Sequence, residues 1–388
     1  MKTFAPIFVG CCPAACGIHL IILCFLSLAS FAADPAWRSA EPGWQYAWPR
    51  DHFPHPDFKT EWWYFTGSLH TPDGRRFGYE LTFFRQGLRP PGSPPVTSRF
   101  VASDLKLAHF AITDVKGDRF TSWQRLTRGA FGEAGFGNGA TEPRLAWNED
   151  WTLTLEKDGS FSIQAREADD ALALQLEPTK PMTPHGENGI SRKAAVEGHA
   201  AHYYSATRLR TRGTFTIDGQ PLSGEGESWF DHEWATNQLA PGQSGWDWFS
   251  LQFADGTELM LYQLRRLDGS IDAASSGTWI AADGAARHLR HEDLKLTPTR
   301  WWTSPKTRGR YPIGWHVEIP SLALSAEVST PVEAQELTVP PIVYWEGLID
   351  ATGTRAGQKV AAHGYLELTG YAGTMEALQG LAPAPARP

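Results

Sequence analysis

Six Asp-Gly pairs are spread along the sequence, each flanked by short stretches that resemble β-strands. The pairs occupy positions 73–74, 158–159, 218–219, 255–256, 268–269 and 283–284. Asp-Gly is a preferred β-hairpin turn because both central residues of that turn take positive φ. After the first pair, Phe77, Tyr79, Leu81 and Phe83 alternate onto one face. No segment has a helical period over three turns, so we predict an all-β sandwich or barrel.

A weak internal repeat predicts two domains. Trp63-Tyr-Phe, the turn at Asp73-Gly and a strand to Arg85 resemble Trp248-Phe-Ser, the turn at Asp255-Gly and a strand to Arg265. The residues before this region are rich in proline and irregular. We therefore expect an N-terminal arm at 34–50, a first domain at 51–236, a second domain at 237–374 and a flexible tail at 375–388.

The first 33 residues have the features of a secretory signal peptide. Lys2 precedes an apolar stretch from Gly17 to Ala33, and Ser30 and Ala32 supply small residues before a cleavage position near Ala32. An uncleaved N-terminal anchor is the alternative, although the apolar stretch is near the lower length limit for a membrane-spanning helix. We therefore expect a periplasmic or secreted protein.

Cysteine content and charge exclude several classes of chemistry. All four cysteines lie within the first 24 residues, so the mature chain lacks thiols, disulfides and thiolate metal sites. The formal net charge is −8 and no Lys/Arg cluster occurs, which argues against a nucleic-acid partner and against lasting contact with an anionic membrane surface. The 17 tryptophans are expected mainly in the core, and otherwise in the lining of an apolar site.

Longer motifs resemble a known family. In chain order they are HPxxKTEWWYxTG from His55, AHFAITD from Ala108, YYSxTRL from Tyr203, SWFDHEW from Ser228, GWDWFSLQ from Gly245, YWEG from Tyr344 and GYxExTGY from Gly364. With this series the chain resembles the AttH/CrtC-like proteins, which include carotenoid 1,2-hydratases (hydroxyneurosporene synthases) and many proteins labelled secreted hydrolases. The resemblance spans about residues 50–372.

The resemblance implies two consecutive lipocalin-like (calycin) β-barrel domains and an apolar substrate or ligand. Members that are carotenoid hydratases use an acidic residue to protonate an isolated double bond, and water then captures the carbocation. Related fungal proteins are pericyclase-like enzymes, and other members accompany ABC-type permeases. Membership of the family therefore implies one fold but is compatible with several activities.

Asp231 is the candidate acid, and the resemblance maps it onto the acid of the family. A carboxyl group among aromatic side chains has a raised pKa, so it can keep its proton near neutral pH. The hydratases favour tyrosine at the position of Trp229, and this exchange removes a hydroxyl donor. The alternative is that Asp231 belongs to a structural Asp-His-Glu cluster where the two barrels meet.

The remaining candidates surround Asp231 in the motifs. We predict Asp231, Trp229 and Tyr204 as catalytic residues. The predicted substrate-binding residues are Glu61, Trp62, Trp63, Tyr203, His232, Trp234, Trp246 and Trp248. Glu61 could instead pair with Arg85 or Arg208. Tyr203 and Tyr204 alternate, so only one of them is expected to face inward.

No metal site and no cofactor are predicted. His232 and Glu233 follow Asp231 directly, and neighbouring residues of a strand point to opposite faces, so they rarely bind one ion. The sequence has no His-x-His or His-Glu-x-x-His pattern. It also lacks the Gly-x-Ser-x-Gly elbow of many hydrolases.

Three functions remain. The first is an exported enzyme that hydrates or isomerises a C=C bond of an apolar isoprenoid, polyene or lipid-like molecule, a hydro-lyase rather than a hydrolase. The second is a non-catalytic carrier of such a molecule for an ABC-type transporter of the envelope. The third is a structural module of that transporter. The expected partners are an apolar small molecule and, for the second and third functions, the permease complex.

Overall fold

A computed structural model of the protein describes residues 36–95, 97–98, 100–139, 142–340 and 342–373. The predicted signal peptide at 1–33 and the predicted tail at 375–388 lie outside the described residues. Within these ranges the regular structure consists of β-strands and three short 3₁₀ helices, at Arg50–His52, His291–Asp293 and Pro320–Leu322. In the described part of the chain, no helix is long and apolar enough to cross a bilayer.

The first sheet is antiparallel and has 13 strands. They are β1 (Thr60–His70), β2 (Arg76–Gly87), β3 (Asp104–Asp114), β4 (Arg119–Thr127), β5 (Ala134–Phe136), β6 (Arg144–Asn148), β7 (Trp151–Leu155), β8 (Phe161–Glu167), β9 (Asp170–Pro178), β10 (Thr183–Pro184), β11 (Ser191–Arg192), β12 (Ala200–Ile217) and β13 (Gln220–Ala235). The main order is β4-β3-β2-β1-β13-β12-β9-β8-β7-β6-β5. The sheet curls into a nearly closed barrel. Near its two edges, Arg125 of β4 donates to the backbone oxygen of Asn148 in β6 at 3.0 Å.

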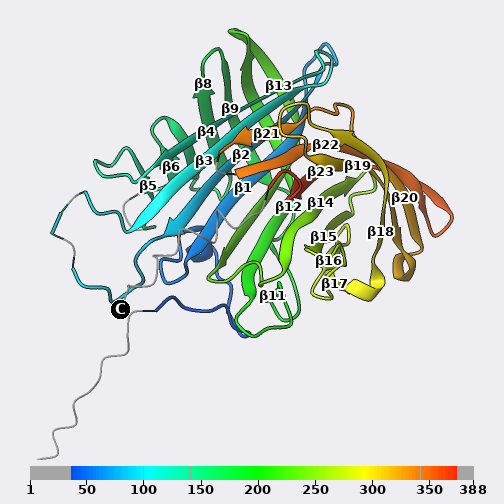
Figure 1. Ribbon diagram of the computed structural model, residues 1–388. Helices are drawn as coiled ribbons and strands as arrows, with labels where there is room; N and C mark the ends of the chain where they lie inside the picture. Colours follow the sequence, from blue (N-terminus) through cyan, green and yellow to red (C-terminus); the bar gives the residue numbers. More distant parts are fainter. Residues whose placement is uncertain (1–35, 96, 99, 140–141, 341, 374–388) are drawn as a thin grey trace, which may run out of the picture. The chain divides into compact units, whose positions relative to one another are not determined.

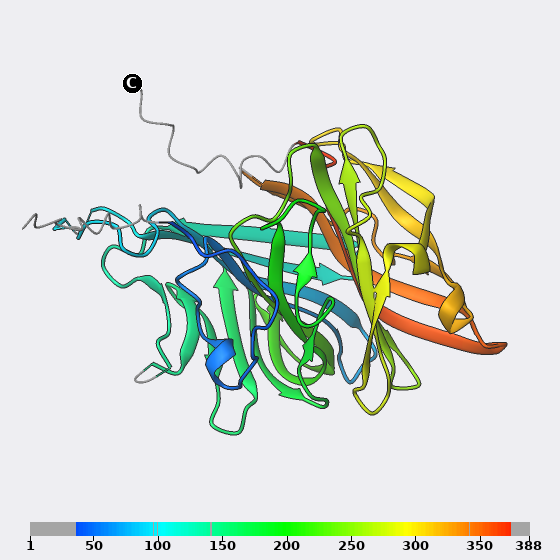
Figure 2. The same ribbon diagram turned by 90° about the horizontal axis from the view of Figure 1, so that it is seen from below.

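The second sheet has ten strands and forms a half-barrel. They are β14 (Gln243–Phe253), β15 (Glu258–Arg266), β16 (Ser276–Ile280), β17 (Ala286–Arg290), β18 (Lys295–Thr303), β19 (Arg310–Ile319), β20 (Leu324–Ser329), β21 (Glu336–Val339), β22 (Ile342–Arg355) and β23 (Gln358–Thr369). Figures 1 and 2 show these strands, from yellow-green to red, beside the blue-to-green first sheet. The predicted fold class, all-β with two lipocalin-like barrels, is therefore confirmed.

The two sheets repeat one strand order. The first runs β4-β3-β2-β1-β13-β12, and the second runs β17-β16-β15-β14-β23-β22. The hairpin β1–β2 thus corresponds to β14–β15, which are the two segments that the sequence repeat relates. The glycines of all six Asp-Gly pairs have positive φ, between 75° and 89°, but among the aspartates only Asp218 does, so five of the pairs turn the chain with a single left-handed residue, the glycine.

Apolar side chains form three separate clusters. One fills the first barrel and another fills the concave side of the second sheet. The third lies between the sheets and is built from the outer face of the first sheet and residues of the second, including Tyr64, Trp229, Trp248 and Leu348. Seven of the 17 tryptophans are buried in these clusters, and six more are partly buried and pack against them.

A β-bulge in β12 changes which residues face each side. Ser205 and Ala206 pair with Asp231 and Phe230, but the next paired residue of β12 is Leu209. Before the bulge the even-numbered residues face the barrel core, and after it the odd-numbered ones do. Arg208 is thereby turned to the second sheet, where its Nε donates to Glu258 Oε1 at 2.6 Å.

Gly78 of β2 lets the two sheets approach closely. A Cβ atom at this position would lie 2.5 Å from Leu348 Cγ and 2.7 Å from the Tyr365 hydroxyl oxygen. We expect Gly78→Val to reduce the free energy of unfolding by about 1–3 kcal/mol through overpacking, measured by urea denaturation. Adding Leu348→Ala should recover part of the loss, and an unchanged midpoint for Gly78→Val would contradict the close contact.

Candidate functional site

The predicted site residues lie on two opposite faces of the same strands. Side chains of β1, β12 and β13 alternate between the barrel interior and the space between the sheets, because a strand has a period of two. The interior receives Glu61, Trp63, Tyr204, His232 and Trp234; the space between the sheets receives Trp62, Tyr203, Trp229 and Asp231, with Trp246 and Trp248 of β14. The structure therefore does not bring the predicted residues together as one site.

Asp231 is held by three donors from the first sheet. Its Oδ2 accepts a hydrogen bond from the Tyr203 hydroxyl at 2.7 Å. Its Oδ1 accepts bonds from the Ser205 hydroxyl and from the Trp229 indole, the latter at 2.6 Å. Tyr203 in turn accepts a bond from Trp248 Nε1 at 3.0 Å, so the second sheet also fixes this carboxyl.

Burial is the dominant influence on the acidity of Asp231, whose exposed fraction is 4%. It raises the pKa of the carboxyl to about 7, against the opposing effect of the three hydrogen bonds. The charge of Glu233, which pairs with Lys193 at 2.8 Å, raises the pKa further. Asp231 therefore keeps its proton over much of the range in which an ordinary aspartate has lost it.

The structure changes the roles expected for Tyr204 and Trp229, two predicted neighbours of Asp231. Tyr204 was predicted to be catalytic, but it points into the barrel and its hydroxyl lies 2.7 Å from His52 Nδ1. Tyr203 is the tyrosine that reaches Asp231, because Ser205 and Tyr203 share the face of β12 opposite to Tyr204. At Trp229, the tyrosine hydroxyl favoured by the hydratases is replaced by an indole N–H that bonds the same carboxyl.

Three further carboxyl groups between the sheets were missed by the sequence reasoning. Glu80 Oε1 accepts bonds from Thr82 at 2.7 Å and Tyr344 at 3.0 Å. Glu346 accepts a bond from Tyr64 at 2.7 Å, and Glu367 accepts one from Trp246 at 2.9 Å. The family motifs contain Glu346 and Glu367, but their approach to Glu80 depends on the packing of the two sheets.

These carboxyls share the elevated pKa of Asp231. Burial raises the pKa of Glu80 to about 7 and that of Glu367 to about 8. Burial followed by the charges of Glu80 and Glu367 raises the pKa of Glu346 strongly, and Asp231 adds to the effect. Within the described residues none of the three forms an ion pair, and no cation is among the main influences on their pKa values. The space between the sheets therefore holds a group of buried carboxyl groups with raised pKa values.

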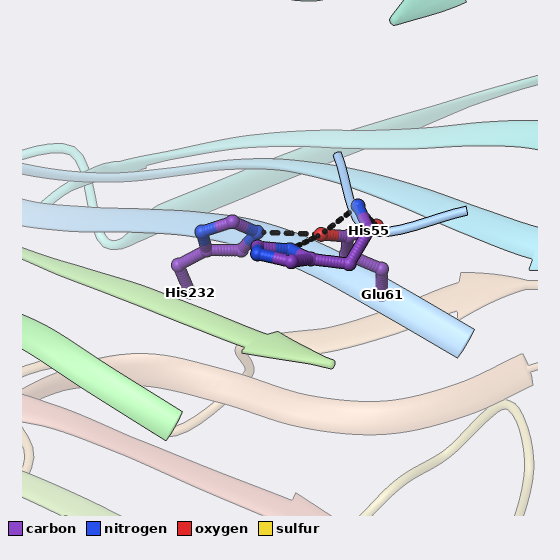
Figure 3. Close-up of side chains that lie close together, drawn as sticks. All are labelled: His55, Glu61 and His232. Atoms are coloured by element: carbon purple, nitrogen blue, oxygen red, sulfur yellow. Dashed lines mark hydrogen bonds and ion pairs between the residues drawn. The ribbon is translucent and has the colours of Figure 1, made fainter. Parts of the chain in front are cut away.

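A different environment surrounds Glu61 inside the barrel. Its Oε1 lies 2.7 Å from His55 Nδ1 and 2.9 Å from His232 Nε2 (Figure 3). Arg85 Nε donates to the other oxygen at 3.1 Å, which is the Arg85 pairing considered for this residue. Burial opposes ionisation, but the two imidazoles and Arg85 outweigh it and hold the pKa of Glu61 well below its usual range.

The first barrel is packed with side chains rather than open. A cavity found in its described part has about 10 Å³ of internal space, roughly that of one water molecule. Its lining is apolar and comprises Leu69, Phe77, Gly78, Tyr79, Ile112, Leu172, Leu174 and Phe215. A drug-sized or lipid-sized ligand needs several hundred Å³, so this cavity does not hold one in the structure described.

The two barrel-like sheets place the protein among lipocalin-like proteins with two consecutive β-barrel domains. A profile of the AttH-like family matches residues 39–371. The chain belongs to the AttH-like family.

Solved structures agree with this assignment. A protein from Nitrosomonas europaea assigned as AttH is 33% identical, with a TM-score of 0.77 over 86% of this chain and 99% of that one. Kievitone hydratase from Nectria haematococca is 15% identical, with a TM-score of 0.63 over 84% of this chain and 93% of that one, and shares the fold. None of the curated proteins matches the chain.

The raised pKa of Asp231 has a measurable effect on stability. Its pKa is 3.8 in an unfolded chain and about 7 in the folded protein, so the folded state binds more protons between these values. Stability from Asp231 is thus fully present below about pH 4 and is lost as pH rises to about 7. Relative to Asp231→Asn, the wild type should lose on the order of 4 kcal/mol over this window.

Urea denaturation at a series of pH values measures this difference. Asp283→Asn, in an exposed turn between β16 and β17, controls for the loss of one carboxyl. Parallel pH profiles for the wild type and Asp231→Asn would show that the carboxyl titrates normally.

Proposed function

We propose that the protein is an exported, hydratase-like enzyme that protonates a C=C bond of an apolar substrate with Asp231. The observation that carries this proposal is a buried carboxyl, with its pKa raised to about 7, set among aromatic side chains between the sheets. A general acid works best when its pKa lies near the operating pH. The export follows from the predicted signal peptide.

The proposed reaction begins with transfer of the Asp231 proton to one alkene carbon. The O–H bond breaks, a C–H bond forms and the other carbon becomes a carbocation. The rings of Tyr203, Trp229 and Trp248 present electron-rich faces that stabilise a cation. Water then adds to the cation, and the proton that it releases returns to the Asp231 carboxylate, so the acid is regenerated.

The hydrogen bonds to Asp231 suit both of its protonation states. Tyr203 and Ser205 carry hydroxyl groups that can donate to the carboxylate or turn to accept from the acid. Trp229 donates in both states and fixes the orientation of the carboxyl. The carboxylate that remains after proton transfer therefore keeps its hydrogen-bond donors.

Access to this site requires movement, because Asp231 is almost fully buried. The segment between β13 and β14 packs Leu239 against the cluster between the sheets. We propose that a substrate reaches Asp231 when this segment or the sheets separate. Because the first barrel is packed with side chains, the proposal assigns the apolar molecule to the region between the sheets, where such a movement would expose Asp231.

The likeness to a hydratase fold supports the reaction class. Kievitone hydratase has the same fold, and its name identifies an enzyme that adds water. The carrier function and an association with an ABC-type permease remain alternatives for a protein of this family. They predict binding of an apolar molecule without turnover.

Asp231→Asn tests the proposal directly. Wild type and variant are incubated with kievitone and with an acyclic carotenoid in ¹⁸O-labelled water, and products carrying one added water are measured by mass spectrometry. We expect turnover by the wild type and a loss of about 10²–10⁴-fold in the variant, the usual contribution of a general acid. Binding measured by tryptophan fluorescence should persist.

Glu336→Gln is the matched control. Glu336 is a buried carboxyl of β21 that bonds Ser304, Thr307 and Tyr311, away from Asp231. This variant should keep wild-type turnover. Equal rates for the wild type and Asp231→Asn would contradict the proposed acid, and binding without turnover in every form would favour the carrier function.

A further inference from the structure

Two histidines and a glutamate meet inside the first barrel from separate parts of the chain. His55 precedes β1, Glu61 lies in β1 and His232 lies in β13. Their candidate ligand atoms, His55 Nδ1, Glu61 Oε1 and His232 Nε2, lie within 4.8 Å of one another. Figure 3 shows both imidazole rings directed at the same carboxylate oxygen. Imidazole nitrogens with a carboxylate oxygen are a common donor set for zinc and related ions.

The outer nitrogens of both rings have acceptors from one residue. His232 Nδ1 lies 2.9 Å from the backbone oxygen of Asp51. His55 Nε2 lies 3.3 Å from Asp51 Oδ1. Metal-binding histidines almost always donate their second ring N–H to a carbonyl or carboxylate in this way. With each ring donating outward, both inner nitrogens present lone pairs to Glu61 Oε1.

The three inner atoms surround one small space that either ring protons or a cation can occupy. With a proton on each inner nitrogen, both rings donate to Glu61 Oε1 across the separations of 2.7 and 2.9 Å. With both rings donating outward to Asp51, the inner nitrogens present lone pairs, and a divalent ion between them satisfies all three atoms at once.

Aromatic packing holds the two rings in place before an ion binds. His55 stacks on Trp234 with ring centroids 3.7 Å apart and planes 7° apart. His232 stacks on Trp63 at 4.6 Å and 24°. Little side-chain freedom is therefore lost when an ion binds, which favours binding.

Arg85 bonds only one oxygen of Glu61. Its Nε donates to Oε2, and its Nη2 donates to the backbone oxygens of His55 and Phe58. The other oxygen, Oε1, accepts the backbone N–H of His55 at 3.0 Å and would be the atom that binds an ion. Ligand atoms about 2.0–2.1 Å from a tetrahedral ion lie roughly 3.3 Å apart, so the present separations of 2.7 and 2.9 Å would widen by about half an ångström.

We propose that His55, Glu61 and His232 form a binding site for one divalent first-row transition ion, represented by Zn²⁺. The ion would join the segment before β1 to the two strands β1 and β13, and so fasten that segment to the barrel. The site lies on the opposite face of β13 from Asp231, so it is separate from the proposed acid catalysis. The earlier expectation of no metal site considered His232 only with its strand neighbours and did not include His55 and Glu61.

Zinc binding to the purified protein tests this proposal. After removal of metal with a chelator, the protein is titrated with Zn²⁺ by isothermal calorimetry near neutral pH, and its melting temperature is recorded with and without the ion. We expect one equivalent to bind and the melting temperature to rise, because an ion bound to the folded state stabilises it. Absence of binding by folded wild-type protein would overturn the proposal in favour of a protonated ion-pair cluster.

Variants locate the bound ion. Glu61→Gln and His232→Gln should each weaken Zn²⁺ binding at least tenfold. His202→Gln is the control, because His202 in β12 packs beside the same Trp234, with ring centroids 5.6 Å apart, but bonds no carboxylate within the described residues. Unchanged binding in the first two variants, or equal weakening in the control, would overturn the assignment.

A measurement on the wild type covers the case in which a variant does not fold. Crystals grown with Zn²⁺ should give an anomalous difference peak between His55 Nδ1, Glu61 Oε1 and His232 Nε2. A peak only at other positions would overturn the site. Co²⁺ substituted for Zn²⁺ should show the visible absorption bands of nitrogen and oxygen coordination.

Discussion

Strand β1, the first half of β12 and the second half of β13 are buried on both faces, and the rest of the structure depends on this. Their inner side chains fill the first barrel, and their outer side chains pack against the second sheet. Each step of one residue therefore moves a side chain from one chemical environment to another. Asp231 and His232 are neighbours in sequence, yet they belong to separate clusters with different chemistry.

The two environments act on carboxyl groups in opposite ways. Inside the barrel, Glu61 is surrounded by donors and by Arg85, which keep it ionised despite burial. Between the sheets, Asp231 and Glu367 accept hydrogen bonds from neutral donors and form no ion pair within the described part of the chain, and burial raises their pKa values. One strand pair thus separates a carboxylate suited to binding a cation from an acid suited to giving up a proton.

Much of the fold could be predicted from local signals. The Asp-Gly turns gave the hairpins, and the repeated segments around Trp63 and Trp248 corresponded to equivalent strands in the two sheets. The orientation of Tyr203 and Tyr204 could not be predicted in the same way. A strand buried on both faces lacks the contrast between apolar and polar positions that assigns a face.

The site was predictable only in part for a related reason. The environment of Asp231 was anticipated from its aromatic neighbours in the sequence. The approach of Glu80 to Glu346, and of Glu61 to His232 across 171 positions, depends on tertiary packing. Both motifs that supply His55, Glu61 and His232 were visible, but no short spacing joins them.

The β-bulge in β12 limits the insertions and deletions that this strand can accept. Residues 200–206 and 209–217 keep their apolar side chains in one core only because the bulge offsets their phase. Deletion of one bulge residue would shift one of the two segments by one position, so that its side chains would point to the opposite face. If residues 200–206 shifted, Tyr203 and Tyr204 would exchange faces. The spacing within this strand is thus as restrictive as the identity of its residues, and sequence length can vary more freely in the surface turns than here.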